Sequence, residues 1–228
     1  MVSPLYRGNN VECPVCGSRY RKFLPYGNKG EDNRLCPKCL SLERHRLLWL
    51  WLKEKTDFFT ADMNVLHIAP EQPFLKRFRS LQNLKYTTAD LESPIADIRL
   101  DIRNMPLDDN QFDVVICNHV LEHIDNEMQA IKEVYRVLKD GGWAILQVPV
   151  DYSREITFED SSITDRLERE KIFGQYDHLR VHGMDYPKRL EAGGFEVECD
   201  EFVKQFDKSV IERFRLPAED IIYVCRKN

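Results

Sequence analysis

The sequence lacks an apolar segment long enough to cross a membrane. Its longest apolar run, residues 47–52, has six residues, whereas a membrane-spanning helix needs about 20. The amino-terminal stretch MVSPLYRGNN also lacks the apolar core of a signal peptide. We therefore expect a cytoplasmic protein that does not associate with membranes.

The sequence also lacks an excess of positive charge, internal repeats and low-complexity segments. Its net charge of -5 argues against a molecule that binds a polyanion over its whole surface. The charge is uneven, however, because residues 1–55 hold eleven basic and five acidic side chains and so carry +6. With 228 residues, 43% of them hydrophobic, the chain has enough apolar material for one sizeable core and a small appendage.

The chain has seven cysteines, and four of them form two C-x-x-C pairs. Cys13 and Cys16 make the first pair, and Cys36 and Cys39 make the second, 19 residues later. This spacing is typical of two knuckles that hold one zinc ion in a closed tetrahedron of thiolates. Disulfides are the alternative, which the lack of a secretion signal disfavours. We expect a structural zinc ion that folds the module.

Two neighbouring segments each leave two interpretations open. Residues 19–30, RYRKFLPYGNKG, mix basic and aromatic side chains. They either contact a nucleic acid or form the small core of a zinc hairpin, and we favour the hairpin. Residues 41–55 are predicted to form a helix capped by Ser41. This helix is apolar all round over residues 47–52, so it needs packing partners on several sides, although exposed tryptophans that bind a partner are the alternative.

From residue 64 onward, predicted strands alternate with predicted helices. Residues 108–149 show the pattern best, because a buried strand, a loop, a helix over residues 125–138 and a second buried strand follow one another. Such a unit is a right-handed parallel crossover. Residues 139–142, which include Gly141, are expected to end the helix. Further strands are predicted at residues 64–68, 85–90, 96–101, 195–202 and 218–225, with helices at 73–80 and 184–192.

This alternation predicts an α/β fold, a Rossmann-like sheet with helices on both faces. The expected domains are a zinc-ribbon-like module at residues 1–40, a linking helix at 41–60 and the α/β domain at 61–228. Residues 151–182 are polar and form an insertion, with a helix at 162–172, that we expect to cover the site. Ligands of open parallel sheets bind beyond the carboxyl ends of the strands. That rule directs attention to Asn118, His119, Glu122 and His123.

Together these features resemble a class I S-adenosylmethionine-dependent methyltransferase over residues 64–228. The matching features are the acidic Asp90 at the end of the second strand, the pair Asp101-Ile102 ahead of LDDNQFDVVICNHVLEHI, and the late E-A-G-G-F turn. The resemblance implies seven strands in the order 3-2-1-4-5-7-6, with the seventh antiparallel. It also implies that the chain binds S-adenosylmethionine or S-adenosylhomocysteine.

The family pattern can be carried over to individual positions. Asp90 matches the carboxylate that accepts the ribose hydroxyls, and Leu91 matches the apolar residue under the adenine. Asp101 and Ile102 match the pair that meets the adenine edge. Residues that match the methionine end of the site and its reacting methyl group are Asn118 and His119.

The loop after the first strand departs from that pattern. The family has an acidic residue followed by G-x-G, whereas this chain has His67 and then Ala69, Pro70 and Glu71. The resemblance therefore implies altered cofactor contacts. Either Glu71 or His67 replaces the missing acid at the methionine ammonium, or both merely stabilise the loop.

The whole chain also resembles an uncharacterised bacterial group of methyltransferase-like proteins with the loop L-H-I-A-P-E. That group brings no known substrate. A ribosomal-RNA guanine methyltransferase has the same order of zinc module and methyltransferase domain, which is an architectural similarity only.

Methyl transfer needs alignment and sometimes a base, but no nucleophilic residue. The D/N-P-P-Y/F signature of adenine and glutamine methyltransferases is absent. We consider His119 and His178 as bases, His123 less so, and Arg180 as a clamp for an anionic substrate group. The leading function is a methyltransferase of a small molecule or glycan. An RNA methyltransferase docked through the basic module and a non-catalytic scaffold are the alternatives.

Overall fold

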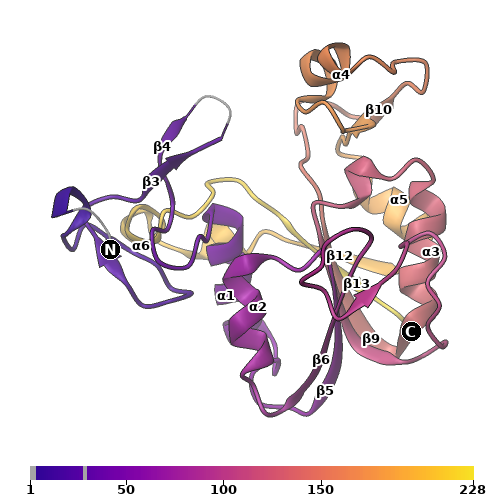
Figure 1. The fold of residues 1–228 in the computed structure, drawn as a ribbon, viewed down its shortest axis with the longest axis horizontal. Helices are drawn as coiled ribbons and strands as arrows, with labels where there is room; N and C mark the ends of the chain where they lie inside the picture. Colours follow the sequence, from indigo (N-terminus) through magenta and orange to yellow (C-terminus); the bar gives the residue numbers. More distant parts are fainter. Residues whose placement is uncertain (1–3, 28–29) are drawn as a thin grey trace. The chain divides into compact units, whose positions relative to one another are not determined.

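The computed structural model describes residues 4–27 and 30–228, and the chain divides into two compact units (Figure 1). The first unit contains the residues up to Asp62 together with Glu71–Leu84 and Asp200–Ile222. The second unit contains Met63–Pro70, Lys85–Cys199 and Tyr223–Asn228. Within the described part of the chain, no helix combines the length and the apolar character that a membrane span requires.

A seven-stranded, mostly parallel sheet forms the second unit, as predicted. In space its strands follow the order β12-β13-β9-β8-β5-β6-β7. Counted along the chain within this sheet, that is the order 3-2-1-4-5-7-6 from β7 to β12. β13 pairs antiparallel with β9. The bounds are β5 (Met63–Ile68), β6 (Leu84–Asp90), β7 (Ile98–Arg99), β8 (Phe112–Asn118), β9 (Leu138–Gln147), β12 (Glu196–Asp200) and β13 (Ile222–Arg226).

The central strands form because their apolar, β-branched residues are buried on both faces. In β8 every residue except Asp113 is buried, and the strand pairs in parallel with β5 on one side and with β9 on the other. Asp113 lies at the start of the pairing, where its Oδ2 accepts a hydrogen bond from the Asn64 backbone at 2.8 Å. This carboxylate satisfies a strand-end donor and so helps to fix the register.

The helix before β9 ends within one residue of its predicted end, but the residues expected to end it do not form a separate turn. α3 (Glu127–Val137) passes directly into β9 at Leu138, so residues 139–142 belong to the strand. Gly141 has the left-handed backbone expected of it, with φ of 77°, but at an irregularity within the strand. Its N–H donates to the Lys227 carbonyl at 2.7 Å, and the Lys227 N–H donates to Gly142 at 3.1 Å. Gly141 and Gly142 therefore pair with the distant carboxyl-terminal segment and do not cap α3.

α3 and α5 (Tyr186–Ala192) lie on the same side of the sheet (Figure 1). The side chain of Asn126 caps α3 by accepting from the Gln129 N–H at 3.2 Å. The turn after α5 contains Gly193, at which a Cβ atom would lie 2.2 Å from Cγ2 of Ile131 in α3. The two helices therefore approach each other at a point where only glycine fits.

The polar insertion has its own small fold within the second unit. β10 (Phe158–Glu159) pairs antiparallel with β11 (Arg180–Val181), and α4 (Arg166–Phe173) lies between them in sequence. The helix begins four residues later than predicted, because Asp165 caps it by accepting from the Glu168 N–H at 2.9 Å. In Figure 1 this segment, drawn in orange, projects from one end of its unit.

The first unit combines two hairpins with helices from distant parts of the chain. Its elements are η1 (Pro4–Tyr6), β1 (Val11–Glu12), β2 (Arg19–Tyr20), β3 (Leu24–Tyr26), β4 (Glu31–Leu35), α1 (Glu43–Lys55), α2 (Gln72–Arg79), η3 (Phe202–Gln205) and α6 (Lys208–Phe214). α1 begins at Glu43 with Leu42 as its cap, so Ser41 is not the cap. The apolar helix finds its partners here, since Trp49 stacks on Phe74 and Phe78 of α2.

Replacing Gly193 with alanine tests the contact between α3 and α5. The added methyl group overlaps Ile131, and we expect Gly193→Ala to lower the free energy of unfolding by about 1–3 kcal/mol. A double-mutant cycle with Ile131→Ala, measured by chemical denaturation, is the check. The double variant should lose less than the sum of the two single losses. Additive losses would show that the two residues do not contact each other.

A buried ion pair in the second unit predicts a pH dependence of stability. Oε1 of Glu127 lies 2.6 Å from Nε2 of His182, and Oε2 accepts from Nε of Arg189 at 2.7 Å. Burial alone would raise the pKa of Glu127, but His182 and Arg189 outweigh it, so the pKa lies below its ordinary value of 4.5. The carboxylate therefore stabilises the fold above about pH 4.5, and this contribution is lost as the pH falls further.

We therefore expect Glu127→Gln to cost about 3 kcal/mol near pH 7. The variant should also show a shallower fall in stability below pH 4.5. Urea denaturation of both proteins between pH 3 and pH 7 measures this difference, and parallel curves would contradict it.

Candidate functional site

A hollow that is partly open to solvent lies at the carboxyl ends of β5, β6 and β8, with an empty volume, open solvent included, of about 400 Å³. This is the edge at which open parallel sheets bind ligands. Most of its wall is apolar, and the two carboxylates of Asp90 and Asp101 interrupt it. Its lining residues are Ile68, Ala69, Asp90, Leu91, Leu100, Asp101, Ile102, Val120 and Ile124.

Asp90 is the last residue of β6 and shapes the turn that follows it. Its Oδ1 accepts from the N–H groups of Glu92 at 2.8 Å and of Ser93 at 2.7 Å. This Asx-type turn leaves Leu91, which is 49% exposed, at the wall of the cavity. An acceptor oxygen and an apolar side chain thus stand next to each other at the strand end.

Asp101 is held in place by Arg103. The guanidinium donates to both carboxylate oxygens, with Nε 3.0 Å from Oδ1 and Nη2 2.6 Å from Oδ2. Hydrogen bonds from Arg103 hold the pKa of Asp101 below its ordinary value, so the carboxylate is charged at neutral pH. Arg103 also donates to Asp125 at 2.7 Å and thereby joins the loops after β7 and β8.

In the loop after β5, Ala69 stands where the resemblance implies a glycine. Its φ is 50°, which is the left-handed conformation that glycine adopts at lower cost. The Ala69 N–H donates to the Ala89 carbonyl at 2.8 Å and ties the ends of β5 and β6 together. The Ala69 backbone therefore adopts the conformation that a glycine would adopt there, and the loop accommodates the alanine methyl group.

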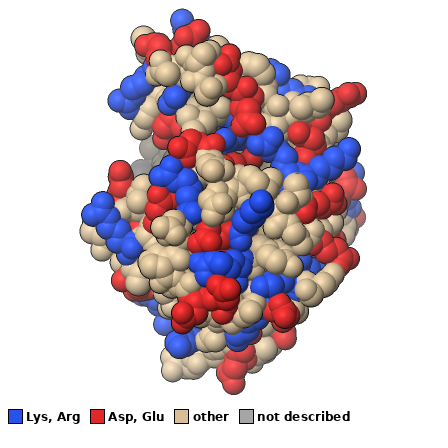
Figure 2. All heavy atoms as spheres, turned by 90° about the vertical axis from the view of Figure 1, so that its right-hand side faces the viewer, with Lys and Arg blue, Asp and Glu red and all other residues tan. Residues whose placement is uncertain are grey.

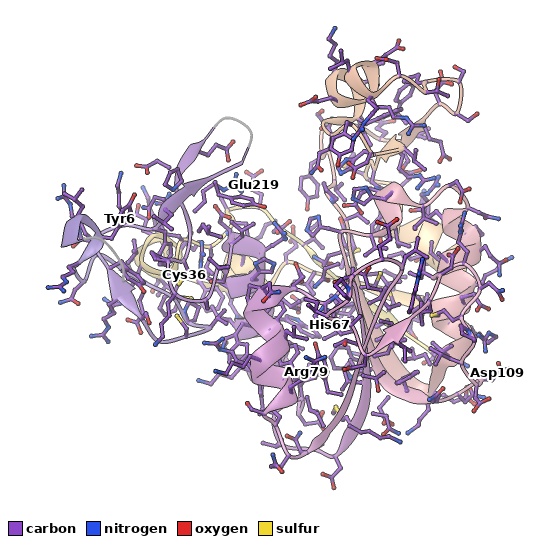
Figure 3. The ribbon with its side chains drawn as sticks, in the orientation of Figure 1. Tyr6, Cys36, His67, Arg79, Asp109 and Glu219 are labelled. Carbon is purple, nitrogen blue, oxygen red and sulfur yellow. The ribbon has the colours of Figure 1, made fainter. Side chains whose placement is uncertain are left out.

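His67 and Glu71, the two candidates for the missing acid, both have structural contacts. His67 is fully buried in β5, and its Nδ1 lies 2.7 Å from the Tyr86 hydroxyl (Figure 3). Oε1 of Glu71 lies 2.5 Å from Nε2 of His45 and 3.7 Å from Nε of Arg44. Neither side chain lines the cavity. These contacts favour the third interpretation, in which both residues stabilise the loop.

β8 ends with Asn118, which is buried, and the loop after it begins with His119, whose φ is 55°. The His119 N–H donates to the Gln147 carbonyl at 2.7 Å, and Nδ1 lies 3.4 Å from Oε1 of Glu122. Burial alone would raise the pKa of Glu122, but its contact with His119 lowers it below the ordinary value. Glu122 belongs to the short helix η2 (Leu121–His123).

The structure does not support Arg180 as a clamp for substrate. Its guanidinium is 3% exposed and donates to the carbonyls of Leu121 and Ile124 at 2.6 Å each. A further bond, 2.9 Å long, joins Nε to Glu159. Arg180 therefore holds the loop after β8 in place, because its donors are used within the protein. His178 is also buried, and burial lowers its pKa.

The four cysteines of the two C-x-x-C pairs converge in the first unit, where Cys36 marks them in Figure 3. Their sulfur atoms all lie within 4.8 Å of one another. The two knuckles have matching turns, because Gly17 after the first pair has a φ of 66° and Leu40 after the second has a φ of 61°. Such a cluster of free thiols suggests a metal site.

The basic and aromatic segment between the two cysteine pairs is mostly engaged in folding its own module. Tyr20 and Phe23 are buried in the core around the cysteines. Arg19 pairs with Glu12 at 3.1 Å, and Lys22 pairs with Asp32 at 2.8 Å. Lys29 of this segment lies outside the described residues. The contacts favour the interpretation as a hairpin core.

Sequence reasoning missed four apolar lining residues, Ile68, Leu100, Val120 and Ile124. Each is the direct neighbour in the chain of a residue that the sequence did indicate, so its place in the chain was a usable signal. What the sequence did not show was which side chains of these loops turn toward the hollow.

Comparison with known proteins agrees with this geometry. Residues 52–146 match a family described as a methyltransferase domain. A probable S-adenosylmethionine-dependent methyltransferase of Mycolicibacterium smegmatis is 30% identical over 105 residues, covering 44% of this chain and 37% of that protein. A sterol 4-C-methyltransferase of Caenorhabditis elegans is 30% identical over 161 residues, covering 69% of this chain and 41% of that protein. The chain thus spans less than half the length of these curated relatives.

Solved structures share the fold at low sequence identity. An S-adenosylmethionine-dependent methyltransferase from Mesorhizobium loti superimposes with a TM-score of 0.55 at 12% identity, covering 79% of this chain and 98% of that one. A Burkholderia thailandensis 1,6-didemethyltoxoflavin-N1-methyltransferase with bound S-adenosylhomocysteine gives 0.54 at 12% identity, covering 82% and 78%. The chain is thus similar to the methyltransferase-domain family over residues 52–146, and it shares its fold with these two structures.

Proposed function

We propose that the second unit binds S-adenosylmethionine in the cavity and transfers its methyl group to a small molecule or glycan. The observation that carries this proposal is the arrangement of Asp90 and Asp101 in an otherwise apolar hollow at the carboxyl ends of the strands. A nucleoside needs such a site, because it combines a flat apolar base with a polar ribose. The residues present therefore fit the nucleoside part of the cofactor.

The lining residues have distinct roles in this proposal. Asp90 accepts the ribose hydroxyls, since its Oδ2 has no hydrogen-bond partner among the residues that the structure describes. Asp101 accepts from the adenine amine, and Leu91 and Ile102 supply the apolar contacts. When bound, the cofactor supplies an electrophilic methyl group on its sulfonium. His119, partly exposed at the end of β8, is the group we propose as a base toward the acceptor.

A small acceptor is favoured over RNA by what the basic module does with its charges. Arg19 and Lys22 of this module each pair with a carboxylate of the same module, Glu12 and Asp32 respectively. On the face of the second unit that Figure 2 shows, basic and acidic side chains are interspersed and do not form an area of one sign. The sterol and toxoflavin methyltransferases named above act on small molecules by their names.

We also propose a structural zinc ion at Cys13, Cys16, Cys36 and Cys39. The sulfur atoms of Cys13 and Cys39 are 3.5 Å apart, and those of Cys16 and Cys36 are 3.7 Å apart. A tetrahedral zinc ion with bonds of about 2.3 Å to sulfur requires separations of roughly 3.8 Å. The thiols are thus arranged as zinc would hold them, and the fourfold sulfur shell leaves no position for a substrate.

Calorimetric titration with S-adenosylmethionine tests the cofactor site. The intact chain should bind it, and Asp90→Asn should weaken binding about 10- to 100-fold, because a hydrogen bond to a charged group is lost while the turn keeps its acceptor. Glu92→Gln is the matched control, because this exposed neighbour does not line the cavity. No binding by the intact chain would favour the non-catalytic scaffold, and equal affinities of the two variants would refute the role of Asp90.

Metal analysis tests the zinc site. We expect about one zinc per chain, lost almost entirely in Cys36→Ser together with a lower unfolding temperature. Cys199→Ser is the control, because this exposed cysteine lies outside the cluster. Elemental analysis after dialysis gives the zinc content. An intact chain that folds with the same stability in the presence of a strong chelator would contradict a structural zinc.

A further inference from the structure

Three side chains of the second unit form a second cluster with metal-binding chemistry. We call Glu122, His123 and His178 the Glu-His-His cluster. One ligand atom from each of them lies within 4.8 Å of the other two. Glu122 and His123 come from η2, and His178 comes from the insertion shortly before β11. The Leu179 N–H donates to the Glu122 carbonyl at 2.9 Å and holds the two segments together.

The carboxylate of Glu122 is incompletely satisfied. The residue is 1% exposed, and Oε2 has no hydrogen-bond partner among the residues that the structure describes. Its other oxygen faces Nδ1 of His119 at 3.4 Å, which is longer than a good hydrogen bond. A buried carboxylate oxygen without a partner is costly, so its presence calls for a ligand.

Both histidines are oriented for metal binding. Nδ1 of His123 lies 3.3 Å from the Asp177 carbonyl, and Nδ1 of His178 lies 3.2 Å from the Phe173 carbonyl. A carbonyl oxygen only accepts, so each Nδ1 carries the proton and donates. This leaves Nε2 of both rings with a lone pair. Metal-binding histidines are held in the same way, with the second ring nitrogen bonded to a carbonyl.

We infer that the Glu-His-His cluster binds a divalent transition-metal ion. One carboxylate and two neutral imidazoles form a ligand set that suits manganese, iron, cobalt or zinc. Bonds of about 2.1 Å place ligand atoms roughly 3–4 Å apart, so the side chains need to move by less than about 1 Å. The positive charge of Arg180 is near the cluster, because its guanidinium donates to the Leu121 carbonyl beside Glu122. Glu159 balances this charge, with Oε2 2.9 Å from Nε of Arg180.

The position of the Glu-His-His cluster next to the proposed cofactor cavity indicates what a bound ion would do. Val120 and Ile124, which flank η2 in the sequence, both line the proposed cofactor cavity. Nδ1 of His119, the base that we propose toward the acceptor, lies 3.4 Å from Oε1 of Glu122, so an ion at Glu122 and His123 would lie beside the proposed acceptor. A bound cation lowers the pKa of a hydroxyl that coordinates it. This favours an acceptor with one or two hydroxyl groups, a consequence that rests on the proposed methyltransferase function.

Manganese is the probe for the test, because its hard-ligand preference separates this cluster from the four thiolates. The full-length chain, loaded with only the one equivalent of zinc that the four thiolates would hold, is titrated with Mn²⁺, and bound metal is counted by electron paramagnetic resonance. We expect about one Mn²⁺ per chain. Glu122→Gln and the milder His123→Gln should each weaken binding at least about tenfold. Glu133→Gln is the matched control, a buried carboxylate that pairs with Arg136 at 2.8 Å outside the cluster.

Two outcomes would overturn the inference. They are no Mn²⁺ bound by the intact chain, and equal binding by the intact chain and by folded His123→Gln. The far-ultraviolet circular dichroism and unfolding temperature of each variant show whether it is folded. Cofactor titrations of the same variants separate the two proposals, because loss of Mn²⁺ with unchanged S-adenosylmethionine affinity implicates the metal site alone. A chain that binds Mn²⁺ but no cofactor keeps the metal site and refutes the proposed function.

Discussion

Parallel pairing of β8 with β5 and with β9 is the constraint on which both candidate sites in the second unit depend. The register places Ile68 opposite Cys117 and Asn118 opposite Gln147. The loops that follow β5 and β8 consequently leave the sheet side by side. A shift by one residue would turn every side chain of β8 to the other face. Because β8 is buried on both sides, such a shift would be costly. The register of the strands therefore determines where the two loops begin.

Both of these loops begin with a non-glycine residue in the left-handed conformation. Ala69 follows β5 with a φ of 50°, and His119 follows β8 with a φ of 55°. This conformation costs roughly 1–2 kcal/mol per residue, and such strain is concentrated at functional sites. In each case a backbone hydrogen bond to the neighbouring strand end offsets part of that cost, from Ala69 to Ala89 and from His119 to Gln147. The chain thus forms both sharp turns with residues other than glycine, and at Ala69 it does so where the resemblance implies a glycine.

The sequence predicted the features that depend on local pattern or spacing. The strands, α3, the two cysteine pairs and the acidic ends of β6 and β7 all follow from nearby residues. The features it missed depend on partners far away in the chain. Burial of Arg180 depends on carbonyls of Leu121 and Ile124, and the engagement of Glu71 depends on His45. Side-chain chemistry alone made Arg180 look like a clamp and Glu71 look like a cofactor ligand. The contacts that favour a structural role for both residues are seen only in the folded chain.

The first unit shows why the cysteine module is not a separate segment. Arg46 is fully buried, with its guanidinium 4.6 Å from the centre of the Phe23 ring. It donates to the carbonyls of Ser41 at 2.8 Å and of Phe214 and Arg215 at 2.7 Å each. Burial lowers its pKa to about 10, so it stays charged at neutral pH and needs these acceptors.

The buried charge of Arg46 links the amino-terminal part of the chain to the end of α6. A zinc ion with four thiolates is formally dianionic, and the cysteines and Glu43 favour the charged form of the guanidinium. Loss of the metal would remove part of the negative charge that balances the Arg46 guanidinium. The hydrogen bonds from Arg46 to the carbonyls of Phe214 and Arg215 would then be less favourable. A second link, from Arg213 to Glu12 at 2.6 Å, runs between the same two segments. The proposed zinc ion would therefore stabilise α6 as well as the knuckles, although some 170 residues separate them in the sequence.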